Sequence, residues 1–161
     1  MHRAASRILA AAFLVLVARA VPAQPLPTNV DHYLCYRASA VEGSAEFVPV
    51  DRALRDQFVP TTTCTLKKVV TLCNPADKNG GEGIVHPSDH QVGYRIKAAP
   101  GTPRFVKRTH VTLDQFGSLT VRVLGPASLL VPSSKALGGN GAPPYGTPGV
   151  RHYACYRARV P

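Results

Sequence analysis

The sequence lacks the short motifs that identify the common hydrolases and nucleotide-binding proteins. It contains no G-x-S-x-G, no S-x-x-K, no phosphate-binding P-loop and no H-E-x-x-H zinc signature. It also lacks an uninterrupted apolar run of about 20 residues, the length at which a helix spans a bilayer. These absences argue against a serine hydrolase, a nucleotide-dependent enzyme and a membrane-spanning protein.

The first 23 residues nevertheless have the features of a secretory signal peptide. Arg3 and Arg7 precede an apolar run that is too short to span a membrane, and the small residue Ala23 ends the segment. An Ala-Arg-Ala sequence just before it is a competing cleavage site. We therefore expect 1–23 to be a signal peptide, 24–161 to be the mature chain, and the protein to be secreted, either extracellular or periplasmic.

Acidic residues are scarce, with 9 Asp and Glu against 19 Lys and Arg, so the formal net charge is +10. Removal of the three arginines of the leader lowers this charge to +7. Aromatic residues interspersed among cations are typical of nucleic-acid-binding proteins, but a secreted chain meets a polyanionic glycan or an envelope component instead. No nucleic-acid partner is expected, and the alternative is that the basic surface only keeps the protein soluble.

What the sequence does contain is one short motif that occurs three times. It reads Asp-His-Tyr-Leu-Cys-Tyr-Arg-Ala at 31–38, Asp-His-Gln-Val-Gly-Tyr-Arg-Ile at 89–96, and Arg-His-Tyr-Ala-Cys-Tyr-Arg-Ala at 151–158. A longer match links the first two copies, because eleven of the residues in 31–58 are identical to those 58 positions later. After a one-residue slip, 72–78 aligns with 129–135. This pattern indicates an internal duplication.

The duplication and the composition predict an all-β protein. Fifteen Pro and thirteen Gly break the chain into short segments, and no helix is expected outside the leader. The expected fold is a duplicated antiparallel β-sandwich or barrel-like domain closed by a C-terminal strand. We expect a single domain at 24–161, made of repeats at 31–88 and 89–150 and a closing strand at 151–160.

Each copy of the motif alternates like a strand with one buried face. The face expected to point inward carries the motif tyrosines, so Tyr36, Tyr94 and Tyr156 are predicted to be buried. The opposite face carries the repeated arginines and is expected to meet solvent or a covering loop. Further strands are expected at 46–52, 65–72, 104–112 and 118–124.

Asp-Gln-Phe occurs in both repeats, at 56–58 and 114–116. The Asp is expected to bond the nearby backbone in a tight turn, while the Phe fills the edge of the core. Asp56 and Asp114 could act as catalytic carboxylates instead, but their shared local context favours a repeated turn.

Two glycine-rich segments, 78–83 and 136–149, are expected to be loops. The oxygen-bearing side chains from Asp77 to Glu82 faintly resemble a calcium loop, although a lysine interrupts them and Asn-Gly is itself a favoured turn. The second loop is expected to be a mobile connection without a functional role. No cofactor is expected.

Four cysteines in a chain bound for an oxidising compartment favour disulfides over metal ligation or catalysis. The repeat alignment matches Cys35 with Gly93 and Cys73 with Leu130, so both cysteines are missing together from the second repeat. Their joint absence is expected if the two form one bond. Disulfides are therefore predicted for Cys35 with Cys73 and for Cys64 with Cys155, and a Cys73–Cys155 bond is the open alternative.

The segments 32–37, 56–58 and 72–80, with their second copies, resemble an uncharacterised family of secreted bacterial repeat proteins known only as a domain of unknown function. The resemblance covers nearly all of the mature chain. It implies an extracytoplasmic β-rich module and brings no catalytic residues. The chain departs from the family at Gly93 and Leu130, where cysteines are usual.

The leading functional hypothesis is a secreted, non-catalytic structural or binding module of unknown ligand, with association at the cell surface as one option. The second hypothesis is a secreted metal-dependent enzyme or metal-binding protein that uses the motif histidines His32, His90 and His152. Three imidazoles that converge about a pseudo-symmetry axis suit zinc or copper. A buried histidine at the start of a strand, bonded to backbone, explains the recurrence better.

Overall fold

The structure is a computed structural model that describes residues 30–137, 141–144, 146 and 149–161. The predicted signal peptide lies outside the described residues, as does part of the glycine-rich loop before the third motif. The described chain contains no helix and forms seven strands: β1 (His32–Arg37), β2 (Val50–Leu54), β3 (Thr62–Ala76), β4 (His90–Ala98), β5 (Arg108–Asp114), β6 (Gly117–Ser133) and β7 (Tyr153–Arg159). The predicted all-β fold is confirmed.

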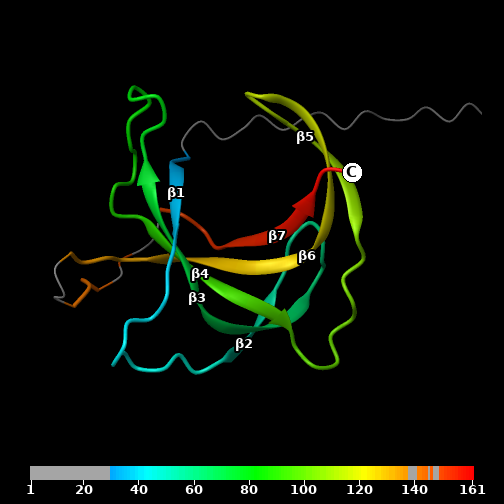
Figure 1. Ribbon diagram of the computed structural model, residues 1–161, viewed down its shortest axis with the longest axis horizontal. Helices are drawn as coiled ribbons and strands as arrows, with labels where there is room; N and C mark the ends of the chain where they lie inside the picture. The colour runs from blue at the N-terminus through cyan, green and yellow to red at the C-terminus, as the bar shows by residue number, and fades with distance from the viewer. Residues whose placement is uncertain (1–29, 138–140, 145, 147–148) are drawn as a thin grey trace, which may run out of the picture.

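The strands pair antiparallel in one curled sheet that forms a half-barrel (Figure 1). Two long strands organise it, because β3 and β6 contain 15 and 17 residues. β3 pairs with β1 and β2 along one edge and with β4 along the other. β6 in turn pairs with β4 and β5 along one edge and with β7 along the other. The strands predicted at 65–72 and 118–124 are thus parts of longer elements.

The two halves of the sheet also share their registers. His32 of β1 lies opposite Ala76 of β3, and His90 of β4 lies opposite Ser133 of β6. These pairs correspond in the sequence alignment. The β3–β4 and β6–β7 ladders each contain two register shifts, and these shifts also fall at corresponding positions. Residues that align in the sequence therefore occupy equivalent places in the sheet.

The hydrophobic core lies on the concave face of the half-barrel. Burial of apolar side chains there is the main favourable contribution to folding. The fully buried members are Cys64, Leu66, Ile96 and Leu129, and the partly buried residues packed against them are Phe47, Val50, Leu54, Tyr94 and Val131.

The inward face of the motif is buried only where its strand is covered. Tyr94 on the central strand β4 is half-buried and stacks on Phe47 with ring centroids 5.0 Å apart, and Tyr156 on β7 is also half-buried. Tyr36 is 51% exposed, so the prediction that it is buried is wrong. The reason is that no aromatic ring of the described chain packs on Tyr36, whereas Phe47 packs on Tyr94 and Phe58 packs on Tyr156.

The opposite face of β4, which was expected to meet solvent or a covering loop, is buried at Gln91 and Gly93 and exposed at Arg95 and Lys97. Gln91 is only 1% exposed. A Cβ at Gly93 would lie 3.0 Å from Thr71 Cβ and 3.0 Å from Leu130 Cδ2. The two neighbouring strands therefore approach so closely that glycine is the residue that fits without displacement.

The aspartate that begins the first two motifs holds a loop in place. Asp31 accepts hydrogen bonds from the backbone N–H of Val85 (2.6 Å) and of His86 (2.9 Å), and its Oδ2 lies 3.0 Å from His86 Nδ1. Burial alone would raise the pKa of Asp31, but these hydrogen bonds outweigh it, so the pKa lies below its ordinary value. In the second copy, Asp89 accepts a hydrogen bond from Gly149 N at 2.9 Å. Each aspartate thus anchors the loop before the next motif.

Candidate functional site

Both Asp-Gln-Phe segments form the predicted turn. In the first, Asp56 Oδ1 accepts a hydrogen bond from Phe58 N at 2.8 Å. In the second, Asp114 Oδ1 accepts the equivalent bond from Phe116 N, also at 2.8 Å. Carboxylates that bond the backbone two residues later stabilise such turns. This use of both carboxylates supports a structural role for them.

Only the first turn is packed, and it joins the two ends of the half-barrel. The Phe58 ring lies edge-on to Tyr156 and also contacts His110, with centroids 5.0 Å apart in each case. The Tyr156 hydroxyl donates a 2.5 Å hydrogen bond to Asp56 Oδ2. Among the strands of the described chain, β7 pairs with β6 alone, so the predicted closure by the terminal strand is made through side chains and not through backbone pairing. The Phe116 ring does not fill the core, since it is 89% exposed.

A pocket of about 630 Å³ opens beside this closure. Its floor is apolar and includes Leu54 of β2, Ile96 of β4 and Phe105 from the segment between β4 and β5. Tyr156 forms part of the wall and stacks on Phe105 with centroids 5.5 Å apart. Strands from both halves of the sheet therefore build this pocket.

Cations surround the apolar floor. Five basic residues line the pocket, all of them solvent-exposed, and no Asp or Glu of the described chain is among its lining residues. They are Lys97 of β4, Arg104 and Lys107 of the following segment, and Arg157 and Arg159 of β7. A cleft lined by charge of one sign concentrates ligands of the opposite sign. The arrangement therefore suits a ligand with several anionic groups and an apolar or ring-shaped body.

The titratable groups deep in the pocket are held in their neutral forms. Burial raises the pKa of the Cys64 thiol, which disfavours the nucleophilic thiolate. Burial, with a smaller contribution from the hydrogen bond to Asp56, also raises the pKa of Tyr156 well above its ordinary value. Tyr156 therefore acts as a hydrogen-bond donor, and the pocket presents cations and hydrophobic surface to a ligand.

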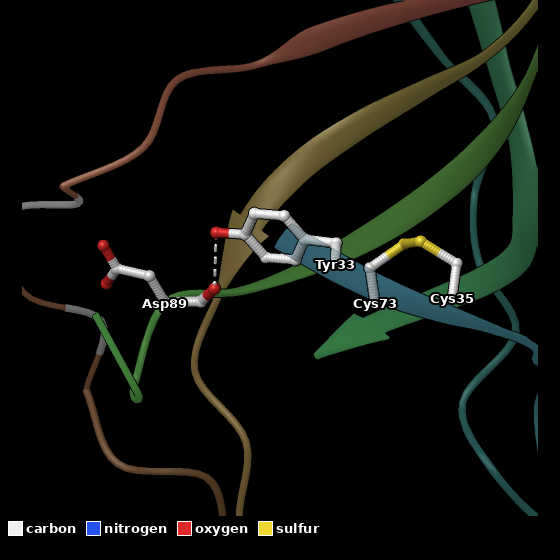
Figure 2. Close-up of a disulfide and its surroundings, with 4 residues drawn as sticks. All are labelled: Tyr33, Cys35, Cys73 and Asp89. Carbon is white, nitrogen blue, oxygen red and sulfur yellow. Dashed lines mark hydrogen bonds between the residues drawn. A yellow bond between two sulfur atoms is a disulfide. The ribbon is translucent and has the colours of Figure 1, made fainter. Parts of the chain in front are cut away.

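The Cys35–Cys73 disulfide is present, as predicted. It joins opposed residues of β1 and β3. Figure 2 shows it beside Tyr33, whose hydroxyl donates a 3.0 Å hydrogen bond to the backbone oxygen of Asp89. Because its two cysteines are separated by 38 positions in the sequence, the bond stabilises the fold by about 4 kcal/mol through restriction of the unfolded chain.

The second predicted disulfide is not formed, because Cys64 and Cys155 are both free thiols. Cys64 lines the pocket together with Tyr156. Cys155 is not among the described residues that line this pocket. The prediction of this bond rested on elimination alone, because Cys64 and Cys155 were the two cysteines that remained. The alternative bond to Cys73 is also absent, since Cys73 is bonded to Cys35.

The three motif histidines do not form a cluster. His32 is exposed, and its Nε2 lies 2.8 Å from Glu82 Oε2. His152 is exposed as well, while His90 is half-buried and its pKa is lowered, first by burial and then by Lys135. The described residues contain no group of three His, Cys, Asp or Glu side chains placed to hold a metal ion. Within the described chain, the Nδ1 atom of His90 has no hydrogen-bond partner, so the expectation of buried histidines bonded to backbone is wrong for His90 as well as for the exposed His32 and His152.

The 78–83 segment is a turn held by its own side chains. Asn79 and Gly80 both have positive φ, at 65° and 70°, which is the conformation that Asn-Gly turns adopt. Asp77 Oδ1 accepts a hydrogen bond from Glu82 N at 3.1 Å, and Lys78 Nζ lies 3.0 Å from Glu82 Oε1. The acidic side chains that faintly resembled a calcium loop are thus engaged by residues of the loop and, for Glu82, also by His32 of β1.

The basic pocket was missed in the sequence because its residues come from distant segments. Arg157 and Arg159 were assigned to a solvated face, and Arg104 was only part of an expected strand. The one available signal was the excess of basic over acidic residues. Searches with the chain find no matching protein-family model, no matching curated protein and no matching solved structure. The resemblance to secreted repeat proteins therefore stays a prediction.

Proposed function

We propose that this chain is a secreted, non-catalytic binding module whose ligand is a polyanionic glycan. The observation that carries the proposal is the pocket with an apolar floor, five lining cations and no lining carboxylate. Sulfate and carboxylate groups form charge-assisted hydrogen bonds with arginine and lysine. Sugar rings present apolar faces that pack on aromatic side chains such as Phe105 and Tyr156.

Secretion is supported by the predicted leader together with the Cys35–Cys73 bond, because disulfides persist in oxidising compartments. The part of the chain that the structure describes has no helix that could span a bilayer. A non-catalytic role is supported by the neutral Cys64 thiol and Tyr156 hydroxyl, since the pocket offers neither an activated nucleophile nor a base of matched pKa.

The test is calorimetric titration of the purified chain with a sulfated glucosamine–uronate octasaccharide, a uronate-only oligosaccharide and a neutral dextran fragment. Binding of at least one acidic oligosaccharide and none of the dextran is expected. Affinity should fall as salt is raised, because ions screen exposed charges. Absence of binding to both acidic probes at low salt would overturn the proposal.

A pair of double variants locates the site. Arg157→Ser with Arg159→Ser removes two pocket cations and should weaken binding about tenfold or more. Lys67→Ser with Lys68→Ser is the matched control, since it removes the same charge from a separate hollow beneath residues 38–49. A larger loss in the lysine variant would place the ligand in that other hollow and contradict the assignment.

A further inference from the structure

The β5–β6 hairpin exposes apolar side chains that its counterpart in the first half does not. Phe116 in its turn is 89% exposed, and Val111 and Leu113 on β5 are 69% and 76% exposed. The residues of the first hairpin that align with Val111 and Leu113 are Ala53 and Arg55. Clustered apolar groups on a surface mark contact sites more often than isolated ones. The second hairpin therefore has the character of an interaction surface.

The first half shows what such a turn binds. Phe58 packs edge-on against Tyr156, and the same tyrosine donates a hydrogen bond to the turn carboxylate of Asp56. Aromatic pairs in this geometry contribute beyond the area that they bury. The contact thus joins an Asp-Gln-Phe turn to a tyrosine of the repeated motif.

The second turn and the first motif carry the same groups without this contact. Asp114 and Phe116 repeat the turn, with the same internal hydrogen bond. Tyr36 repeats the tyrosine, is followed by arginine as Tyr156 is, and is 51% exposed. Among the described residues, neither Phe116 nor Tyr36 stacks on another ring. Lys78 Nζ donates a 2.7 Å hydrogen bond to Gln115 Oε1, which fixes the hairpin tip.

We propose that these two surfaces bind each other between molecules, so that the occupant of the exposed hairpin is a second copy of this chain. The turn Asp114–Phe116 of one molecule packs on Tyr36 of the next, in the manner of the contact between Phe58 and Tyr156. Every molecule carries both surfaces, and they differ from one another. The contact is therefore heterologous, and repetition of it gives a chain or a closed ring.

The test is sedimentation equilibrium of the purified full chain without glycan. Wild-type protein should show an average mass that rises with concentration. Phe116→Ser and Tyr36→Ser should each sediment as monomers, because each removes one of the two surfaces. The Phe116→Ser variant keeps Tyr36, and the Tyr36→Ser variant keeps the intact turn. An equimolar mixture of the two should therefore form a one-to-one dimer, in which the turn of one variant packs on the tyrosine of the other.

Both replaced side chains are exposed, so the fold should survive, which circular dichroism and an intact Cys35–Cys73 bond would verify. Val41→Ser is the matched control, since it removes a similarly exposed apolar residue outside the proposed contact, and it should assemble as wild type does. A monomer at all concentrations would overturn the proposal. Assembly that is lost in Phe116→Ser but kept in Tyr36→Ser would also overturn it, since hairpins would then pair with hairpins.

The dependence on salt concentration distinguishes self-association from glycan binding. The formal net charge of +7 that remains after removal of the leader opposes contact between copies, and added salt screens that repulsion. Self-association should therefore strengthen with salt, whereas binding of an acidic glycan should weaken. Either proposal can fail without the other.

Discussion

The two halves of this molecule pair their strands in the same way but differ in how their equivalent parts are used. In the first half, the Asp-Gln-Phe turn is packed on His110 and Tyr156, and a disulfide joins β1 to β3. In the second half, Phe116 is exposed, and Gly93 stands opposite Leu130 where the first half has its cysteines.

Position in the sheet explains these differences. β1 is an edge strand, so Cys35 meets a neighbouring strand on one side only, and a covalent bond ties that edge down. β4 is a central strand between β3 and β6, and Thr71 and Leu130 leave no room for a side chain at Gly93. The first turn packs against Tyr156 of β7. The described chain contains no further copy of the motif strand against which the second turn packs. The repeated sequence thus determines how the strands pair, whereas the neighbouring strands and side chains determine how each repeated residue is packed.

The largest expected difference in the free energy of unfolding is between variants of the two turn phenylalanines, Phe58 and Phe116. Phe58→Ala should lower the free energy of unfolding by about 3 kcal/mol, because it removes an aromatic ring packed on two others. Phe116→Ala should change it by less than about 0.5 kcal/mol, since the ring is exposed. Urea unfolding of both variants at low protein concentration measures the difference. Equal losses would show that the second hairpin is packed as well.

A smaller difference in stability is expected between two glycine-to-alanine variants. Gly93→Ala should cost about 2 kcal/mol, because a new Cβ would overpack against Thr71 and Leu130. Gly81→Ala is the control, since nothing lies within 4 Å of its Cβ position. Thermal and chemical unfolding should leave the Gly81 variant unchanged. If the Gly93 variant were equally stable, the close approach of the three central strands would be in error.

The smallest effect is a pH dependence that distinguishes the two motif aspartates. The folded-state pKa of Asp31 is lowered, so its stabilising contribution is present above its unfolded pKa of about 4 and is lost as the pH falls through the folded pKa. Asp31→Asn should therefore flatten the loss of stability below about pH 4. Asp89→Asn is the comparison, because within the described residues Asp89 accepts one backbone hydrogen bond, from Gly149 N, and its effect on the free energy of unfolding should be smaller. Unfolding curves between pH 2 and 6 measure both, and a larger effect at Asp89 would contradict the account of the anchored loop.

The sequence predicted the features that depend on local pattern or on alignment of the repeats. These include the all-β fold, both Asp-Gln-Phe turns and the Cys35–Cys73 bond, for which the joint replacement by Gly93 and Leu130 was the deciding signal. Features that depend on the faces of the curled sheet were not predicted. The exposure of Tyr36 follows from the lack of an aromatic ring packed on it in the described chain, which a repeated motif cannot reveal.

The basic pocket was not predicted for the same reason, because it also depends on how the sheet is curled. The basic pocket combines cations from β4, from β7 and from the segment between β4 and β5, and the curl of the sheet is what brings them together. Alternation along β7 places Arg157 and Arg159 on the face opposite to Tyr156, so it does not predict that all three residues line one pocket. Their convergence with Lys97 requires knowledge of which strands are neighbours and of how the sheet bends.

The most direct test of the proposed binding site is a titration of isotope-labelled protein with the sulfated octasaccharide, followed by nuclear magnetic resonance. Chemical-shift changes should concentrate on Lys97, Phe105, Arg157 and Arg159 and should spare Lys67 and Lys68. They should saturate at one ligand per chain. Changes spread over all basic residues without saturation, or centred on the hollow beneath residues 38–49, would contradict the central claim that the pocket of the half-barrel is the binding site.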